Sequence, residues 1–179
     1  MFQVTVENPD DAFEVEYLYD LAFAPGREAL SSYRLREGVE PVSHLSLVAR
    51  DEVGSLAGAI RFWPVAIGAR RDAALLLGPI AVHPTHQGEG LGGGLIGQSL
   101  ENARDQGWQR VVLVGDAPYY SRFGFEHRPD IRFSPPTNPA RVLSHALIAR
   151  GFTGVSGLVQ SWNPADNLRL EDNGVRSTR

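Results

Sequence analysis

The feature that most constrains this chain is an apolar run that leads into a dense cluster of glycines. Residues 73–82 carry no charged side chain, and such a run is typical of a strand buried on both faces. A short loop follows, and five glycines then fall within residues 88–94, where an apolar repeat with helical spacing begins. Glycines at a helix start leave backbone N–H groups open to a ligand, and the helix dipole favours an anion there. The segment therefore predicts a buried strand, a phosphate-binding loop and a helix in that order.

Two residues inside the apolar run are expected to interrupt its pairing. Gly78-Pro79 lies near the middle of the run, and proline has no N–H group to donate to a neighbouring strand. A bulge or a splayed edge is therefore expected at this point of the strand.

Alternating apolar residues and turn signals predict the remaining elements of one domain, which spans residues 1–179. Phe13, Tyr17 and Leu21 recur at spacing four, and this pattern predicts a first helix that ends near Phe23. The other expected elements are a strand at 2–6, a second helix at 27–36, a hairpin of strands at 45–49 and 55–64, a helix at 91–106, a strand at 111–114, a helical turn at 119–123 and a further strand after residue 123.

The C-terminal part is expected to complete a core formed by residues 1–127. Four prolines within residues 128–141 predict a long surface loop or lid. A helix is expected over residues 142–150 and a last strand over residues 151–162. Residues 163–179 are expected to form a frayed tail.

Composition excludes several classes of chemistry. The 179 residues include no cysteine, which excludes disulfides, thiolate metal ligands and cysteine nucleophiles, and no metal site is expected. All 17 basic residues are arginine, so a P-loop lysine and Schiff-base chemistry are excluded too. A net charge of −4 argues against a nucleic-acid partner. Without a targeting segment or an apolar stretch of roughly 20 residues, a cytoplasmic protein with no membrane contact is expected.

Two phosphate-binding patterns fit the glycine segment, and the first is that of dinucleotide enzymes. Gly88, Gly90 and Gly93 match the spacing GxGxxG, and Asp116 follows the next strand, where an acidic ribose contact is expected. In that fold, however, the first glycine directly follows the strand, whereas here five residues separate it from Val82. An oxidoreductase that binds NAD remains the less favoured alternative.

The second pattern resembles a known superfamily. Gln87-x-x-Gly90-x-Gly92 resembles the Q/R-x-x-G-x-G/A signature of GNAT acyltransferases, and residues 77–84 resemble the fourth strand of that superfamily. Residues 120–125 resemble its Y-x-x-x-G-F element, and residues 113–120 are especially similar to the YhbS-like group of predicted N-acetyltransferases. The resemblance implies an α+β GNAT fold. Such a fold has a central twisted, mostly antiparallel sheet with a V-shaped splay between its fourth and fifth strands, and helices on both faces.

The resemblance also implies acetyl-CoA as co-substrate and a set of site residues. The pantetheine arm would pair with the fourth strand at Ile80, Ala81 and Val82, whose N–H groups are candidate donors to the thioester oxygen. Tyr120 matches the tyrosine that acts as general acid on the departing thiolate, although a core aromatic beside Phe123 and Phe125 is the alternative interpretation. The pyrophosphate would lie on the loop residues Gln87, Gly88, Glu89, Gly90, Leu91, Gly92 and Gly93.

The sequence assigns neither a general base nor an acceptor. His83, His86 and Asp116 lie near the loop, but residues in such positions are more often capping or solvent-facing residues than bases. The acceptor is expected to be an amine of a small molecule or a peptide, and a non-catalytic acyl-CoA sensor and a homodimer are both left open. In this fold the candidate acceptor residues are Ser31, Ser32, Tyr33, Arg34, Arg61, Trp63 and the loop after Arg128, of which the two arginines would bind a carboxylate.

Overall fold

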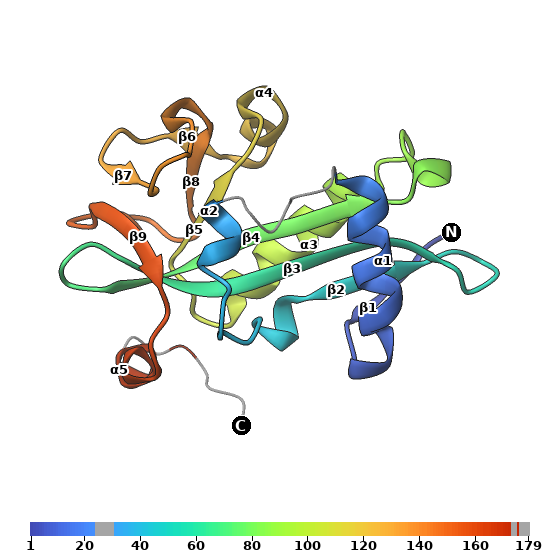
Figure 1. Cartoon of the computed structure of the whole chain (residues 1–179), viewed down its shortest axis with the longest axis horizontal. Coiled ribbons are helices and arrows are strands. Elements are labelled where there is room, and N and C mark those ends of the chain that lie inside the picture. The colour runs from blue at the N-terminus through green and yellow to red at the C-terminus, as the bar shows by residue number, and fades with distance from the viewer. Residues whose placement is uncertain (24–30, 173–174, 176–179) are drawn as a thin grey trace.

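The nine strands that the computed structural model describes form one mixed sheet with helices on both faces (Figure 1). The model describes residues 1–23, 31–172 and 175. The strands are β1 (Gln3–Val6), β2 (Leu47–Arg50), β3 (Leu56–Ile67), β4 (Asp72–Val82), β5 (Arg110–Val114), β6 (Glu126–His127), β7 (Ile131–Arg132), β8 (Val142–Ala146) and β9 (Gly157–Ser161). The helices are α1 (Ala12–Ala22), α2 (Ser31–Arg34), α3 (Leu91–Asp105), α4 (Ala117–Tyr120) and α5 (Asn167–Asp172).

The strand order is β1-β2-β3-β4-β5-β8-β6, and β9 pairs with the far end of β3. Most neighbouring strands are antiparallel, whereas β4 and β5 are parallel to each other, as are β7 and β9. This is the α+β architecture expected from the sequence. It differs from the parallel, doubly wound sheet that a dinucleotide-binding interpretation requires.

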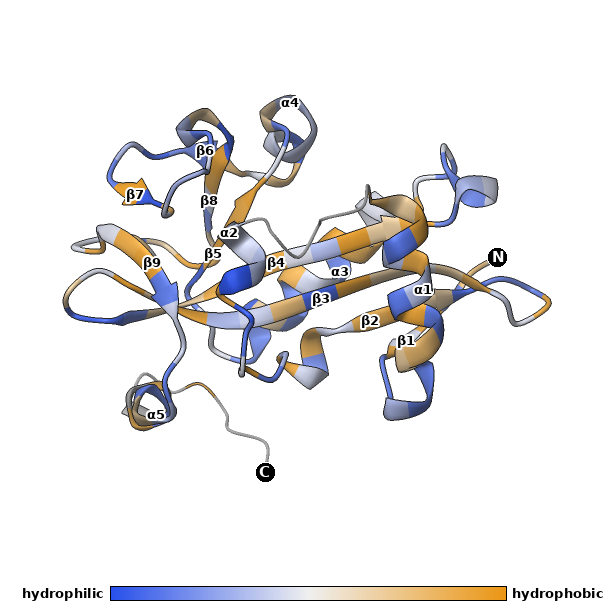
Figure 2. Cartoon of the chain, in the orientation of Figure 1, coloured by the Kyte–Doolittle hydropathy of each residue, from blue (hydrophilic) through white to orange (hydrophobic). Residues whose placement is uncertain are grey.

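The helices α1 and α3 cover opposite faces of the sheet (Figure 1). The side chains of β2 and β3 alternate between the two faces, so Val48 packs toward α1 while Leu47 packs toward α3. Hydrophobic residues run along β4 and β5, between these layers (Figure 2). The spacing-four residues of α1 are not its buried face, because Phe13 is 84% exposed and Tyr17 64%. Val15, Leu18 and Tyr19 form the buried face instead.

The break in β4 falls where Gly78-Pro79 predicted it. Ile60 pairs with Ile80 but Phe62 pairs with Leu77, so β4 has one extra residue across this step. The parallel ladder between β4 and β5 is limited to Leu75 and Leu76 of β4. β5 continues to Val114 with β8 as its other partner. Beyond Leu76 the two parallel strands therefore separate, as the expected splay requires.

The C-terminal part differs from the sequence expectation. The prediction of a helix over residues 142–150 is wrong, because β8 occupies the first half of this segment and pairs with β5 across five residues. The expected surface loop at 128–141 also contains β7 and places Ile131 and Phe133 in the core. Part of the expected tail is also structured, because it contains α5, and Asp166 is buried and paired with Arg71. Residues 173–174 and 176–179 of that tail lie outside the described residues.

Two further expectations concern the second helix and membrane-spanning segments. Of the second helix expected at 27–36, the structure describes α2 and the turn that follows it, whereas residues 24–30 lie outside the described residues. In the part of the chain that the structure describes, no helix combines the length and the apolar character needed to cross a membrane.

Candidate active site

The glycine segment forms a cavity of about 640 Å³, here called the loop cavity. Gly88 and Gly90 adopt φ values of +84° and +78°, in the left-handed region that favours glycine. Gly90 caps α3, and the first N–H groups of a helix have no partner within it. The lining residues are Val82, His86, Gln87, Gly88, Gly90, Leu91, Gly92, Gly93, Tyr119, Arg122 and Phe123. The loop thus presents backbone donors and a helix N-terminus to an open space, which suits a phosphate group.

The splay between β4 and β5 forms a second cavity of about 500 Å³, here called the strand groove. Gly78, Pro79 and Ile80 of β4 line one side, and residues 114–116 line the other. Phe23, Ser32, Tyr33, Arg36, Leu76, Leu77, Tyr119, Tyr120 and Arg141 complete the lining. Since Tyr119 lines both cavities, the strand groove adjoins the loop cavity.

Most of the predicted cofactor residues meet in these two cavities. Ile80 lines the strand groove, and Val82, Gln87, Gly88 and the following glycines line the loop cavity. Two of them line neither. The side chain of Ala81 is buried in the cluster under α1, and exposed Glu89 lies 3.4 Å from His86.

Tyr120 lies at the end of α4, with its ring against the strand groove. Asp116 caps this helix, and its side chain accepts a hydrogen bond from Tyr119 N at 3.3 Å. Gly115 makes room for the ring, because a Cβ there would lie 2.5 Å from Tyr120 Cε2. Burial is the main cause that raises the pKa of Tyr120 to about 12, and the nearby Tyr119 is a smaller one. The phenol is therefore protonated at neutral pH and able to donate a proton.

The two histidines do not reach the strand groove. His83 bonds to Thr85 at 2.7 Å, and His86 lies 3.4 Å from Asp51. Asp116 does line the groove, but its carboxylate has a capping role in α4. The structure thus leaves each of the three candidate bases with a local structural partner.

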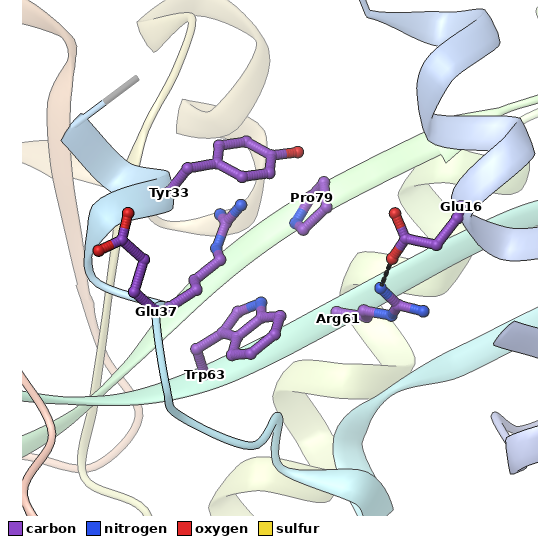
Figure 3. Close-up of a pocket in the computed structure, with 7 residues that line it drawn as sticks. Glu16, Tyr33, Glu37, Arg61, Trp63 and Pro79 are labelled. Carbon is purple, nitrogen blue, oxygen red and sulfur yellow. Dashed lines mark hydrogen bonds and ion pairs between the residues drawn. The ribbon is translucent and has the colours of Figure 1, made fainter. Parts of the chain in front are cut away.

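A third cavity of about 270 Å³, here called the side cavity, opens beside the strand groove (Figure 3). Tyr33, Arg36 and Pro79 line both, so the two spaces adjoin at the break in β4. Glu16, Glu37, Arg61 and Trp63 complete the lining of the side cavity. The strand groove therefore adjoins both the loop cavity and this smaller cavity, which several charged side chains line.

The candidate acceptor residues are divided between these spaces. Tyr33, Arg61 and Trp63 line the side cavity, and Ser32 lines the strand groove. Ser31 hydrogen-bonds to Thr137, which belongs to the loop after Arg128. Exposed Arg34 lines none of the three cavities.

The suggestion that Arg61 binds a ligand carboxylate is wrong. The Arg61 guanidinium is buried and donates to Glu7 through Nε and Nη2, at 3.0 and 2.6 Å, and to Glu16 through Nη1. Burial opposes its charge, but hydrogen bonds to these two carboxylates outweigh burial and raise the pKa of Arg61. The sequence contained no sign of this network, because its members are 45 and 54 residues from Arg61.

Glu16 and Arg36 are among the site residues that the sequence did not indicate. Glu16 comes from α1 and Arg36 from the turn after α2. A single charged residue on a helix or turn is usually solvent-facing, so no local pattern marks either one.

Comparison with known proteins identifies the family. Residues 43–127 match the model of the acetyltransferase (GNAT) domain. The uncharacterized N-acetyltransferase YhbS of Escherichia coli K12 is 33% identical over 159 residues, which cover 88% of this chain and 94% of YhbS. The chain therefore belongs to the GNAT family of N-acetyltransferases, and the family and acyltransferase class expected from the sequence are confirmed.

Two solved structures support the same conclusion. The crystal structure of Escherichia coli YhbS in complex with CoA matches this chain with a TM-score of 0.79 and 30% sequence identity. The match covers 94% of this chain and 92% of the YhbS chain. A GNAT family acetyltransferase from Brucella melitensis in complex with acetyl-CoA has a TM-score of 0.67 and 30% identity, and covers 92% and 97% of the two chains.

Proposed function

We propose that this protein transfers an acetyl group from acetyl-CoA to an amine that enters through the side cavity. The observation that carries the proposal is that the three cavities adjoin one another: the strand groove shares Tyr119 with the loop cavity, and Tyr33, Arg36 and Pro79 with the side cavity. An extended cofactor with a pyrophosphate at one end and a thioester at the other matches this sequence of spaces. The acceptor then reaches the thioester from the opposite end.

The described residues fit this cofactor. Gly88, Gly90, Gly92 and Gly93 give a phosphate close access to backbone donors at the start of α3, and Arg122 adds a cationic side chain to the same cavity. Ile80 and its neighbours in β4 edge the groove where the parallel ladder has ended, so their backbone is able to pair with the amides of a pantetheine arm. Acetyl-CoA supplies an activated acyl group, whose C–S bond breaks as the new C–N bond forms.

Tyr120 is assigned the proton donation to the departing thiolate. Tyr120 lines the groove, and its phenol is protonated at neutral pH, as a proton donor must be. Backbone N–H groups of β4 stabilise the negative charge that develops on the thioester oxygen. Pro79 has no N–H to contribute, so this role falls to Ile80 and the residues that follow it. The amine loses one proton and the thiolate gains one, so the transfer is balanced.

A ligand-dependent stability measurement tests the cofactor assignment. Acetyl-CoA at roughly 100 times its Kd is expected to stabilise the protein by about 2.7 kcal/mol, and CoA is expected to act similarly, whereas NAD and ATP leave the melting temperature unchanged. Stabilisation by NAD with no response to CoA would overturn the proposal. Thiol release on addition of amines then separates an enzyme from an acyl-CoA sensor, which would bind acetyl-CoA without turnover.

A further inference from the structure

A tyrosine of α1 donates a hydrogen bond to the break in β4. The hydroxyl of Tyr19 lies 3.1 Å from the carbonyl oxygen of Pro79, and the contact is buried. The Tyr19 side chain is 0% exposed, and it is not among the described residues that line the three cavities. Tyr19 therefore acts on the backbone of β4 from beneath and does not touch a ligand in the strand groove.

The ladder between β3 and β4 determines which N–H groups of β4 face the strand groove. The N–H of His83 donates to Ala57 O at 2.8 Å, and Ala81 and Ala59 form the pair two positions further along. Hydrogen-bonded pairs alternate along an antiparallel ladder, so Ala81 is bonded to β3. Ile80 belongs to the next pair and directs its N–H away from β3. That edge of β4 is open here, because the ladder with β5 has already ended.

The Pro79 carbonyl and the Ile80 N–H belong to one peptide unit. This unit is trans and planar, so its C=O and N–H bonds point in opposite directions and cannot rotate independently. A hydrogen bond that fixes the Pro79 oxygen on one side therefore also fixes the direction of the Ile80 N–H on the other. The register of β4 against β3 shifts at this step, so the bond from Tyr19 constrains the peptide where regular pairing is interrupted.

The surroundings of Tyr19 hold its hydroxyl in place. The Arg61 guanidinium carbon lies 5.4 Å from the centre of the Tyr19 ring, and Arg61 is itself paired with Glu7 and Glu16. The Phe23 ring centre lies 6.3 Å away on the same helix. A buried ring packed in this way keeps its hydroxyl oriented before any ligand binds, which is the condition for useful electrostatic stabilisation of a transition state.

We infer that Tyr19 is a positioning residue, which directs the N–H of Ile80 toward the thioester oxygen through its hydrogen bond to the Pro79 carbonyl. The inference rests on the proposed acetyl transfer, because the oxygen concerned is that of the acetyl group. It adds a residue that touches neither acetyl-CoA nor the acceptor. The role differs from that of Tyr120, because Tyr19 gives no proton to a reacting group.

Tyr19→Phe tests the inference, because it retains the ring and removes only the hydroxyl. Loss of a whole oxyanion donor costs ~10²–10³ in kcat, so we expect misdirection of one donor to lower kcat at least ~10-fold, measured by release of the CoA thiol. The affinity for CoA, which lacks the thioester oxygen, is expected to be nearly unchanged by calorimetry. Tyr17→Phe is the matched control, because Tyr17 lies on the same helix and is 64% exposed. Unchanged kcat in Tyr19→Phe would overturn the inference.

A destabilised variant separates positioning from stability. Leu18→Ala also removes buried contacts between α1 and the sheet, so it is expected to lower the melting temperature while kcat, measured well below that temperature, stays near the parent value. Tyr19→Phe is expected to lose kcat under the same conditions. A parallel loss of kcat in the two variants would show that Tyr19 has only a structural role.

Infrared spectroscopy of bound acetyl-CoA, labelled with carbon-13 at the thioester carbonyl, tests the same hydrogen bond without turnover. We expect the carbonyl band to shift when the parent protein binds acetyl-CoA, and to return part of the way to its free position in Tyr19→Phe. A band at the same position in both complexes would overturn the inference and leave the acetyl transfer intact. Binding of acetyl-CoA by the parent protein without thiol release on addition of any amine would instead contradict the proposed function.

Discussion

At the scale of single residues, the adjacent tyrosines 119 and 120 have different environments. Tyr120 edges the strand groove beside the break in β4, whereas Tyr119 lies between that groove and the loop cavity. Tyr120→Phe retains the ring contact with Phe125 at 5.9 Å but removes the proton donor. We expect kcat to fall at least ~10-fold, with acetyl-CoA affinity nearly unchanged, since general-acid help is worth ~10²–10⁴ in rate and water replaces part of it.

Steady-state kinetics and calorimetry check this expectation, with Tyr119→Phe as the matched variant and a milder loss expected for it. Equal small losses in both proteins would return Tyr120 to the role of a packing aromatic. Loss of acetyl-CoA affinity with unchanged kcat would make it a cofactor contact instead.

The raised pKa of Tyr120 makes a separate prediction about pH. A raised pKa means that the protonated phenol persists to higher pH than the ordinary value of about 10, and here it reaches about 12. The activity is therefore expected to rise with pH as the acceptor amine loses its proton, without a descending limb below pH 10. A kcat profile measured from pH 6 to 10 checks this. A descending limb near pH 9 that disappears in Tyr120→Phe would contradict the raised pKa.

Gly92 allows a test of the loop cavity without backbone strain, because its φ is not in the left-handed region. A Cβ at Gly92 would lie 3.1 Å from the Tyr119 hydroxyl, and a valine there would fill the space where phosphate is proposed to bind. Gly92→Val is therefore expected to weaken acetyl-CoA binding at least ~10-fold by calorimetry, while circular dichroism stays native. Gly94→Val is the control, since open space surrounds Gly94. Unchanged affinity in Gly92→Val would contradict the loop assignment.

The sequence predicted the loop and Tyr120 because both belong to short motifs with fixed spacing. Glycine spacing reports directly on backbone geometry, and Gly88 and Gly90 do adopt positive φ. Glu16 and Arg36 could not be predicted in this way. They meet in the side cavity only because α1, the turn after α2 and β3 pack together, and a single sequence carries no signal for such a meeting.

At the scale of elements, α1 shows why apolar spacing does not identify a buried face. Apolar residues occur on most sides of this helix. In the sequence, the face that contains Phe13 is therefore as apolar as the face that contains Leu18. In the structure Leu18 is 2% exposed and Phe13 84%. Leu18→Ala is expected to reduce the free energy of unfolding by about 2–4 kcal/mol, and Phe13→Ala to change it by less than about 0.5 kcal/mol. Urea denaturation of both variants checks this, and a larger cost for Phe13→Ala would reverse the orientation of α1.

The strand β8 was missed for a related reason. Residues 142–150 contain leucine, isoleucine and three alanines or arginines of good helix propensity. The conformation is decided by non-local pairing instead, because β8 pairs with β5 along one of its edges and with β6 along the other. Helix propensity is a weak guide wherever the backbone groups at the edge of a strand need hydrogen-bond partners.

At the scale of the whole molecule, the segment that follows β9 is bound to the turn between β3 and β4. Asp166 is 2% exposed and accepts hydrogen bonds from Arg71 Nε at 3.0 Å and Nη2 at 2.8 Å. The same carboxylate accepts from Asn163 N at 2.8 Å, and Arg71 Nη2 also donates to Ser161 O. One ion pair thus joins residues 95 positions apart and holds the chain after β9 against the sheet.

This ion pair predicts that the tail contributes to global stability. Asp166→Asn keeps the shape of the side chain but removes the charge that faces Arg71, and breaking a largely buried pair leaves the other partner without compensation. We expect the free energy of unfolding to fall by about 2–3 kcal/mol. Asp105→Asn is the control, because Asp105 is exposed and 3.7 Å from exposed Arg104, where a surface pair is worth at most about 1 kcal/mol. Urea denaturation that leaves Asp166→Asn as stable as the parent protein would show that the tail folds independently of the sheet.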